Sequence, residues 1–390
     1  MDPSTARALV GEPGRSALAL AETLPDPTSL AAATAVRAEV PPDLAAAVLH
    51  QVQLRRRART RFGELAERWW WTADGLEQAT RSVVARWRAA ELAARGVTAV
   101  ADLGCGVGLD ALAAAEAGLD VIAVEQDEVT AILAEANLSP YGVEVRCGDA
   151  VDLAGGLLGD GRSLLADPAR RTGRGRTWRV EDFSPPYDLV LSWLAEHGGV
   201  VKLGPGLPYD FIPDWCEANW VSDGGDAVEV SLWAGPGTVA GRRRAVVLPV
   251  GDVIDVDPGV EVGEGTPGRH LYEPDPAVAR AEAVDTLAAQ LGAVRLAPGI
   301  AYLTSDVAVP TQFATGFEVL ESFPWKEKVL RSWVRANEIG VLEIKKRGID
   351  VDPAALRKRL HLKGSGTATV VITPTVDGSR VLVVRRLHAG

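Results

Sequence analysis

Three carboxylate side chains, Asp102, Glu125 and Asp149, each stand at or just after the end of a short apolar run. The first run leads into three alternating glycines, at Gly104, Gly106 and Gly108. Because glycine has no Cβ, a ligand can lie against the backbone there, and the helix that begins next offers unpaired N–H groups. Carboxylates beside such a turn accept hydrogen bonds from hydroxyl and amino groups. The spacing therefore predicts a site for a nucleotide-like ligand.

Strands that alternate with helices are the elements that must position these carboxylates. Helical segments are predicted over 111–117 and 129–137, and strands over 121–124 and 143–146. Because parallel strands end at one edge of a sheet, the carboxylates are expected to meet there. A nicotinamide-dinucleotide enzyme is the main alternative for this α/β pattern. It expects G-x-G-x-x-G where this chain has G-x-G-x-G, and it lacks the Gly-Asp pair found here on the third strand.

The run Val100-Ala-Asp102-Leu-Gly104-Cys-Gly106-Val-Gly108 resembles the first motif of class I S-adenosylmethionine (SAM) methyltransferases. The resemblance implies an α/β fold with a Rossmann-like sheet, and it implies SAM as the cofactor. Glu125 is then expected to bind the ribose hydroxyls. Asp149, which is followed by Ala150, is expected to meet the adenine amino group.

A fourth predicted strand, 163–166, is followed by the run Asp167-Pro168-Ala169-Arg170-Arg171. In class I methyltransferases this strand ends beside the transferred methyl group, and amino-methylating relatives carry [D/N]-P-P-aromatic there. The run keeps the first half of that pattern and departs from the second. We expect Asp167 and Pro168 to orient the acceptor, and Arg170 and Arg171 to hold an anionic group. A plain strand-end turn and surface salt bridges are the alternative interpretation.

A chain of 390 residues is too long for one core, and its patterns divide it into four predicted domains. These are a helical N-terminal extension (1–95), a SAM-dependent methyltransferase domain (96–250), a linker with a small ferredoxin-like unit (251–316), and a terminal α+β domain (317–390). The first 25 residues are expected to be loosely ordered, and 76–95 to form one amphipathic helix. The terminal domain has the order β-α-β-α-β-β.

The composition is that of a globular protein, with 47% hydrophobic residues and a net charge of −11. There is no secretory leader pattern at the start and no apolar run of membrane-spanning length, so a cytoplasmic location without membrane contact is expected. The three cysteines and five histidines show no ligand spacing, and no metal is expected. The sequence does not indicate the oligomeric state.

Basic residues gather in three places despite the acidic balance. Arginines cluster over 55–61 and 170–179, and residues 338–390 hold ten Lys or Arg against five Asp or Glu. A charge run is usually a solvated helix face, but the terminal cluster also favours contact with nucleic acid. The run Trp69-Trp70-Trp71 has two interpretations, as an anchor for a helix or as a base-stacking platform.

A narrower resemblance rests on five further runs: Leu76-Glu-Gln78-Ala-Thr80-Arg81, Asp167-Pro-Ala-Arg-Arg171, Val201-Lys202-Leu-Gly-Pro205, Leu271-Tyr272-Glu273-Pro274 and Glu343-Ile-Lys345-Lys346-Arg347-Gly348. Together they resemble bacterial methyltransferases with a C-terminal THUMP-like domain. The core is also similar to trimethylguanosine-synthase-type RNA methyltransferases, although their S-P-P-W element is absent after the fourth strand. The resemblance implies substrate contacts from Gln78, Arg81, Arg171, Lys202, Lys345, Lys346 and Arg347.

These observations predict a SAM-dependent methyltransferase that acts on RNA, with a base of tRNA or rRNA as the acceptor. Two alternatives from other classes remain. One is a catalytically silent RNA-binding protein that keeps the methyltransferase fold. The other is a small-molecule methyltransferase whose terminal domain is only structural.

Overall fold

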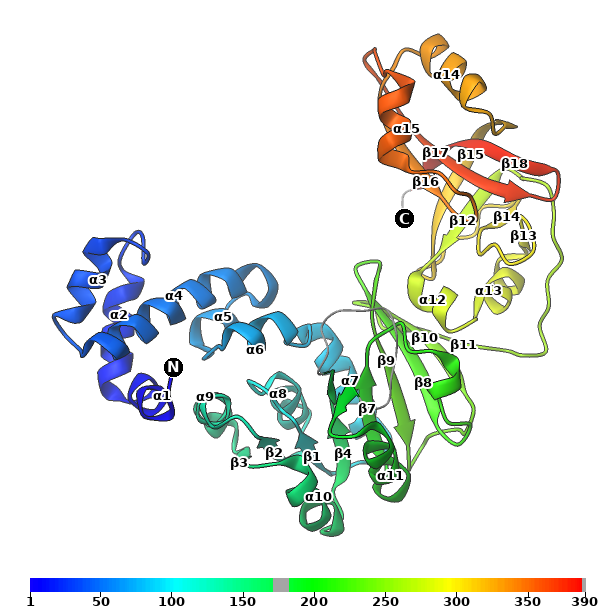
Figure 1. Ribbon diagram of the computed structural model, residues 1–390. Helices are drawn as coiled ribbons and strands as arrows, with labels where there is room; N and C mark the ends of the chain where they lie inside the picture. The colour runs from blue at the N-terminus through cyan, green and yellow to red at the C-terminus, as the bar shows by residue number, and fades with distance from the viewer. Residues whose placement is uncertain (171–181, 388–390) are drawn as a thin grey trace. The chain divides into compact units, whose positions relative to one another are not determined.

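The computed structural model describes residues 1–170 and 182–387 of the chain. The contacts divide it into two units (Figure 1). Unit 1 comprises Met1–Ala218 and Glu229–Gly241, and unit 2 comprises Asn219–Val228 and Arg242–Gly390. None of the helices in the described ranges combines the length and the hydropathy that a bilayer crossing requires.

The sheet of unit 1 has the strand order of α/β folds, in which helices alternate with parallel strands. Six neighbouring strands of this nine-stranded sheet follow the order β9 (Asp226–Ala234), β7 (Gly199–Leu203), β4 (Ser163–Ala166), β1 (Ala99–Leu103), β2 (Asp120–Glu125), β3 (Glu144–Cys147). All neighbouring pairs from β7 to β3 are parallel, and β9 is antiparallel to β7. The order reverses between β1 and β4, and ligands of such sheets bind at the carboxyl ends of the strands beside that point.

Helices before and between the strands pack against the sheet. They are α7 (Ser82–Ala94), α8 (Leu109–Glu116), α9 (Glu128–Leu138), α10 (Ala150–Gly159) and α11 (Tyr187–His197). Buried strand residues such as Val100 and Val121 share one core with Leu92 and Leu112 of the helices. A short hairpin of β5 (Ala169–Arg170) and β6 (Phe183–Ser184) lies outside the main sheet. The α/β fold class with a Rossmann-like sheet is confirmed.

The N-terminal helices are better ordered than the sequence suggested. They are α1 (Pro3–Val10), α2 (Glu12–Glu22), α3 (Leu30–Arg37), α4 (Pro42–Phe62), α5 (Leu65–Arg68) and α6 (Ala73–Gln78). The expectation of a loose first segment was wrong. Asp2 caps α1 by accepting hydrogen bonds from the Ser4 and Thr5 N–H groups, and Leu9 and Leu18 are buried against α4 and its neighbours.

The predicted single helix over 76–95 is divided into α6 and α7. Ala79 ends α6 in an extended conformation, and Arg81 is the N-cap of α7. The break is stabilised from outside the helix, because the Arg61 guanidinium donates to the Leu76 and Ala79 carbonyls. Thr80, between the two helices, is thereby free to bond a side chain elsewhere instead of continuing a helix.

Unit 2 contains β8 (Glu217–Asp223), which begins in unit 1, and a sheet with two helices on one face. Its other elements are β10 (Arg243–Leu248), β11 (Asp252–Asp255), β12 (His270–Pro274), α12 (Pro276–Arg280), α13 (Val284–Leu291), β13 (Val294–Arg295), β14 (Leu303–Ser305), β15 (Ala314–Pro324), α14 (Glu327–Ala336), β16 (Ile339–Lys346), α15 (Pro353–Leu360), β17 (Gly366–Thr375) and β18 (Gly378–Arg386). The seven-stranded sheet has the order β13-β14-β12-β15-β18-β17-β16.

The terminal part of unit 2 has the β-α-β-α-β-β order that the sequence predicted. α14 and α15 bury Leu330, Val334 and Leu356 against one face of its sheet. The turn between β17 and β18 needs glycine at Gly378, because the backbone there has φ +95°. The small α+β terminal domain is therefore confirmed.

Candidate functional site

A cavity of about 850 Å³ lies in unit 1 at the carboxyl ends of β1, β2, β4 and β7. Its walls come from the glycine turn after β1, the ends of β2 and β4, the segment 72–80 and the β5–β6 hairpin. Its volume is within the range of small-molecule and cofactor sites. The cavity is therefore the candidate active site.

The glycine turn provides open space and one tight contact. Gly104 and Gly106 line the cavity with φ +95° and +56°, and a Cβ at either would meet nothing within 4 Å. Positive φ requires glycine at both, and the open side is where a ligand can approach the backbone. Gly108 does not line the cavity. A Cβ at Gly108 would lie 2.6 Å from Leu138 Cδ1, so its glycine serves packing against α9.

Asp102 is an almost fully buried carboxyl group in the wall of the cavity, with 3% of its surface exposed. Its Oδ2 atom has no hydrogen-bond partner. Burial raises the pKa of Asp102 well above its usual value, and the nearby Asp110 and Asp167 carboxylates raise it further. A buried acceptor without a donor is costly, so this atom is suited to a ligand that brings a donor or a positive charge.

Glu125 ends β2, and its carboxylate closes over the glycine turn. It accepts hydrogen bonds from the Gly106 N–H at 3.0 Å and the Asp127 N–H at 2.9 Å. Burial raises the pKa of Glu125, and these backbone donors oppose that effect. Asp149 is exposed at the cavity edge and caps α10 through the Val151 N–H at 2.8 Å. Ala150 follows it, buried, in the cavity wall.

A chain of charged and polar side chains runs from the cavity into the core of unit 1. Asp167, after β4, forms an ion pair with Lys202 of β7. The Lys202 ammonium also donates to Thr80 Oγ1 at 3.0 Å, and the Thr80 hydroxyl donates to Asp110 at 2.6 Å. Arg88 of α7, with a side chain 2% exposed, continues the chain by pairing with Asp110.

Arg88 pairs in addition with Glu229 of β9, whose side chain is also 2% exposed. Burial favours a lower pKa for Arg88, but the Glu229 and Asp110 carboxylates outweigh it and raise the pKa. The same balance holds for Lys202, where burial is outweighed by Asp167 and Asp110, so its pKa is raised. Both cations therefore stay charged, and each is already engaged by carboxylates.

Lys202, for which a substrate contact was predicted, is already engaged by protein side chains. Its ammonium is held by Asp167 and Thr80 at the cavity wall. The predicted catalytic Asp167 and Pro168 both line the cavity. Arg170 belongs to the β5 strand, which pairs with Phe183 of β6, and Arg171 lies outside the described residues.

The segment before α7 contributes more than was predicted for it. Gln78, a predicted substrate residue, lines the cavity at the end of α6. Arg81 does not line it and stands at the start of α7. Sequence reasoning missed Thr80, Arg88 and Asp110. Arg88 carried a recognisable signal, because it lies within the turns of α7 that bury Val84, Ala85, Ala89 and Leu92.

The three tryptophans after α5 are an anchor, since 1%, 4% and 1% of Trp69, Trp70 and Trp71 are exposed. The Trp69 indole donates to the Val107 carbonyl at 3.0 Å, which ties the segment to the glycine turn. Asn137 of α9 bonds both the Trp70 N–H, at 2.7 Å, and the Trp70 carbonyl, at 3.0 Å. These side chains are not available to stack on a base.

In unit 2 the predicted Lys345, Lys346 and Arg347 have unequal surroundings. Lys345 pairs with Glu273 at 2.8 Å, which joins two of the sequence runs singled out above. Arg347 lies over the ring of Tyr302 at 5.5 Å. Lys346 is exposed.

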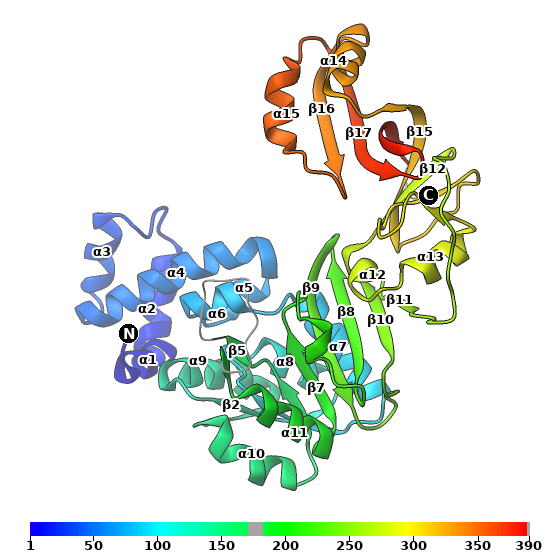
Figure 2. The same ribbon diagram turned by 45° about the vertical axis from the view of Figure 1, so that its right-hand side comes forward.

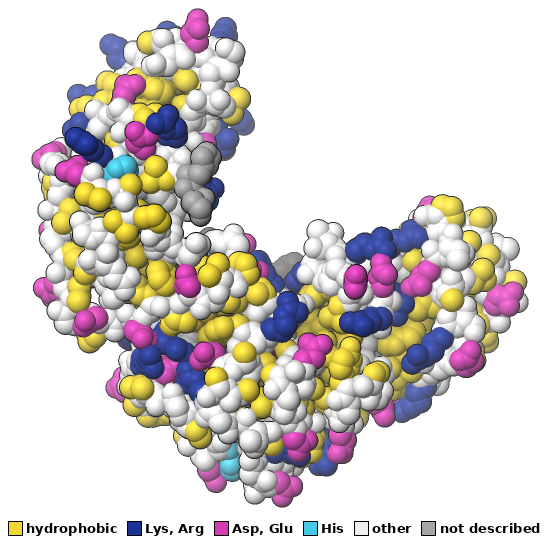
Figure 3. Space-filling model, turned by 180° about the vertical axis from the view of Figure 1, so that it is seen from behind, with side chains coloured by type: hydrophobic (Ala, Val, Ile, Leu, Met, Phe, Trp, Pro, Cys, Tyr) yellow, Lys and Arg dark blue, Asp and Glu magenta, His cyan; other side chains and the backbone are white. Residues whose placement is uncertain are grey.

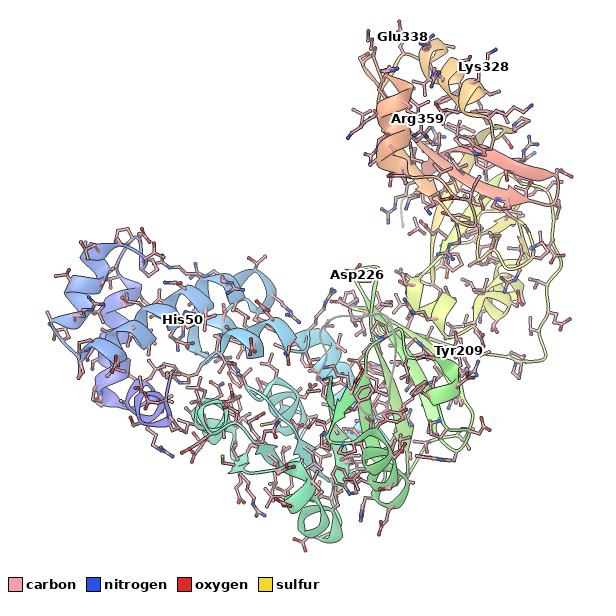
Figure 4. The ribbon with its side chains drawn as sticks, viewed as in Figure 1. His50, Tyr209, Asp226, Lys328, Glu338 and Arg359 are labelled. Atoms are coloured by element: carbon pink, nitrogen blue, oxygen red, sulfur yellow. The ribbon has the colours of Figure 1, made fainter. Side chains whose placement is uncertain are left out.

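Other cations of unit 2 face solvent on the two helices. Lys328 on α14 and Arg359 on α15 are both exposed and are labelled in Figure 4. Within the part of the chain that the structure describes, no group of three His, Cys, Asp or Glu side chains is arranged to hold a metal ion.

Two protein families match parts of the chain. A model described as "THUMP domain-like" matches residues 314–386, and a domain of unknown function (DUF8688) matches residues 2–58. The first match covers the terminal sheet with α14 and α15, and the second covers α1 to most of α4.

Whole-length similarity extends to proteins of two bacteria. Two uncharacterised S-adenosylmethionine-dependent methyltransferases of Mycobacterium tuberculosis, from strains CDC 1551 and H37Rv, are each 35% identical over 335 residues, which is 84% of this chain and 92% of each relative. A crystal structure of a proposed methyltransferase from Porphyromonas gingivalis W83 has a TM-score of 0.80 at 23% identity, covering 100% of both chains. That structure shares the fold of this chain.

Proposed function

The chain belongs to the S-adenosylmethionine-dependent methyltransferases, and from that premise we propose that it methylates a base of tRNA or rRNA. The observation that carries the choice of RNA is the THUMP-like match over residues 314–386, and the exposed cations on α14 and α15 of that domain support it. THUMP-type domains are associated with RNA handling. We place the activity in the cytoplasm, where tRNA and rRNA of bacteria are found.

The cavity fits SAM, whose bound form supplies an electrophilic methyl group on a sulfonium. Glu125 has a carboxylate at the tip of β2, suited to ribose hydroxyls. Gly104 and Gly106 leave the backbone accessible to the cofactor. Asp149 and Ala150 line the part of the cavity that we propose for the adenine. The unpartnered Oδ2 of Asp102 suits a positively charged amine. Gly108 supports the turn from behind by its contact with Leu138.

Asp167 is our proposed acceptor-orienting residue. It lines the cavity at the end of β4, and Lys202 fixes its carboxylate from the side of β7. An amino group of a base can donate to the carboxylate oxygen that Lys202 does not occupy, which points the nitrogen lone pair into the cavity. Pro168 follows Asp167 in the same wall, and Gln78 faces the cavity from α6. Positioning of this kind supplies much of the rate of an in-line displacement.

The cavity itself favours a neutral base over a phosphate. Its described wall contains six carboxylate residues, Asp74, Asp102, Asp110, Glu125, Asp149 and Asp167. The two described cations, Lys202 and Arg88, are both ion-paired. An anionic group is repelled from such a wall. We therefore assign the contacts with the RNA backbone to other surfaces, and propose exposed cations of unit 2 for them, Lys346 among these.

Helices α14 and α15 supply such cations. Lys328, Arg335 and Lys358 are exposed and form no ion pair among the described residues. Their neighbours Arg331 and Arg359 share Glu327. Phosphate contacts by unpaired cations release counterions, and they make binding salt-dependent.

Transfer of radioactive methyl from SAM to unmodified tRNA and rRNA tests this function directly. Nucleoside mass spectrometry of RNA from cells with and without the gene identifies the product. The wild-type protein is expected to label one of the two RNA pools, and Asp167→Ala to bind SAM but label it poorly.

Other outcomes overturn the proposal in distinct ways. SAM binding with transfer to a metabolite extract, and none to RNA, favours a small-molecule methyltransferase. RNA binding without SAM binding favours a catalytically silent RNA-binding protein.

A further inference from the structure

The segment 72–80 forms one wall of the cofactor cavity, and helix α4 holds it at both ends. Thr72, Asp74, Gly75 and Gln78 of this segment line the cavity. The segment follows the tryptophan anchor and ends at Thr80, which joins the chain of side chains that leads to Asp167. We call residues 72–80 the roof segment. In both views α4 lies alongside α5 and α6, which flank this anchor (Figures 1 and 2).

At the first end, side chains of α4 form hydrogen bonds to the backbone of the tryptophan anchor, Trp69 to Trp71. The Gln51 amide, oriented so that both its donor and its acceptor are satisfied, bonds the Trp71 N–H at 2.9 Å and the Trp71 carbonyl at 3.0 Å. Arg55 donates to the Trp69 carbonyl at 3.2 Å and lies over the Trp70 ring at 4.9 Å. Gln51 is 2% exposed, so its hydrogen bonds are shielded from water.

At the second end, Arg61 near the end of α4 reaches the carbonyls that close α6. Its guanidinium donates to the Leu76 carbonyl at 3.2 Å and to the Ala79 carbonyl. These carbonyls lack intrahelical partners because α6 ends there. A positive charge at a helix C-terminus is also favourable electrostatically. The contact fixes the residue just before Thr80, whose hydroxyl must meet both Lys202 and Asp110.

The remaining α4 arginines connect α4 to neighbouring helices and loops of unit 1. Arg57 pairs with Glu77 and Arg59 with Glu67, so the helix is joined to both α5 and α6. Arg56 instead donates to the Leu24 and Pro25 carbonyls inside the N-terminal bundle. On the face drawn in Figure 3, Lys or Arg and acidic side chains are interspersed over the N-terminal helices, as such pairing requires.

The bundle is also fixed to the methyltransferase sheet. Trp70 shares a core with α4 and with Leu133 of α9, the helix that follows β2. Arg7 of α1 pairs with Glu128 at the start of α9, at 2.6 Å. A bundle that packs on α9 and holds both ends of the roof segment cannot move without moving the cavity wall.

We propose that the N-terminal bundle, which contains the matched domain of unknown function, sets the affinity of the methyltransferase for SAM by positioning the roof segment. Arg61 is the positioning residue at the acceptor end of that segment, and Arg55 with Gln51 acts at the other end. The inference concerns cofactor binding alone. It holds whether the acceptor is RNA or a small molecule.

Calorimetric titration of the full-length protein with SAM tests the proposal. Arg61→Ala is expected to raise the Kd for SAM about five- to tenfold, the scale of losing one or two hydrogen bonds. Arg61→Lys keeps the positive charge but loses the forked arrangement of N–H donors. Its Kd for SAM is expected to lie between those of the wild type and Arg61→Ala. The matched control is Arg56→Ala on the same helix, which is expected to bind SAM as the wild type does.

Hydrogen exchange separates this role from a general loss of structure. In Arg61→Ala the amides of 72–80 are expected to exchange faster, while those of β1 and β2 and the Kd for RNA stay unchanged. A folded Arg61→Ala with wild-type SAM affinity overturns the proposal. An equal loss in Arg56→Ala overturns it too. If Arg61→Ala does not fold, Arg61→Lys takes its place. A Kd for SAM higher in Arg61→Lys than in Arg56→Ala then supports the proposal, and equal values overturn it.

Discussion

Two arginine-rich regions of the chain look alike in sequence and differ in what their charges do. The α4 arginines between Arg55 and Arg61 bond carbonyls or carboxylates of unit 1. On α14 and α15 of unit 2, Lys328, Arg335 and Lys358 are exposed and unpaired among the described residues. The count of positive charges is therefore a poor guide to binding. The two regions differ in whether the N–H donors of their cations are already hydrogen-bonded to carbonyls or carboxylates of the protein.

The difference follows from what each helix packs against. α4 lies beside α5 and α6, whose short lengths leave many carbonyls unpaired, and these attract guanidinium donors. α14 packs on a sheet, where backbone groups are paired within strands, and it buries Leu330 and Val334, with Trp333 partly buried beside them. Lys328 and Arg335 of α14 form no ion pair among the described residues and remain in solvent, whereas Arg331 pairs with Glu327.

The largest effect is expected at Arg88, the most buried paired cation. Arg88→Met leaves Asp110 and Glu229 buried without their common partner. Breaking a buried ion pair on one side typically costs about 3–5 kcal/mol of unfolding free energy. Urea denaturation followed by tryptophan fluorescence measures the loss. Lys328→Met, an exposed control in unit 2, is expected to change stability by about 0.5 kcal/mol or less. Equal losses in both variants would remove the distinction drawn here.

The next effect concerns catalysis through the Lys202 contact. Lys202→Met leaves the Asp167 carboxylate without its cation, so the proposed acceptor-orienting group is no longer held. We expect kcat for methyl transfer to fall about a hundredfold, the scale of a misplaced reacting group, with a much smaller change in SAM affinity. Arg162→Met, which breaks the pair with Asp120 at the amino end of β4, is the control. Full activity of Lys202→Met would show that Asp167 does not need its partner.

A third experiment tests the unpaired cations directly. The triple variant Lys328→Ala, Arg335→Ala, Lys358→Ala is expected to weaken RNA binding about tenfold at low salt. The slope of log K against log salt concentration should fall in magnitude by about 2 to 3, because each lost phosphate contact contributes roughly 0.7–0.9. The matched triple variant on α4, Arg56→Ala, Arg57→Ala, Arg59→Ala, removes the same charge from paired positions. Its slope should equal the wild-type slope, and a similar loss in both variants would refute the comparison.

The sequence predicted what local chemistry determines. The glycine turn was predictable because positive φ and open backbone require glycine at Gly104 and Gly106. The β-α-β-α-β-β order of the terminal domain was predictable from periodicity and from the Asp377-Gly378 hairpin. The roles proposed for Asp102, Glu125 and Asp149 remain predictions, although all three line one cavity.

Contacts between distant residues were beyond the sequence. Arg88 and Glu229 are 141 positions apart, and Lys202 and Thr80 are 122 apart. No spacing rule relates such residues. The break between α6 and α7 was missed for the same reason, since the donor that stabilises it comes from Arg61 on another helix. The order of the first 25 residues was missed because their apolar side chains are buried only by distant residues, those of α4 and Leu133 of α9 among them.

The smallest effect is expected in the pH dependence of stability, for two carboxyl groups whose pKa values are shifted in opposite directions. Burial raises the pKa of Asp102, whereas backbone N–H donors from Ala355 and Ala354 lower that of the exposed Asp352 at the start of α15. A raised pKa contributes stability below the unfolded value of about 4, and that stability is lost as pH rises through the folded pKa. Asp102→Asn cannot titrate. Relative to the wild type without SAM, it should therefore gain on the order of 1 kcal/mol of unfolding free energy as pH rises from 5 to 8.

Asp352→Asn should show no such trend over the same range, because a lowered pKa acts only as pH falls below the usual value of about 4. Denaturation at several pH values measures both differences. SAM titration adds the functional side, since Asp102→Asn removes the charge proposed to meet the cofactor amine and should bind SAM more weakly while unfolding less readily at pH 8. An unchanged pH slope in Asp102→Asn would mean that the carboxyl group titrates normally, and the cavity wall would then be wetter than its burial implies.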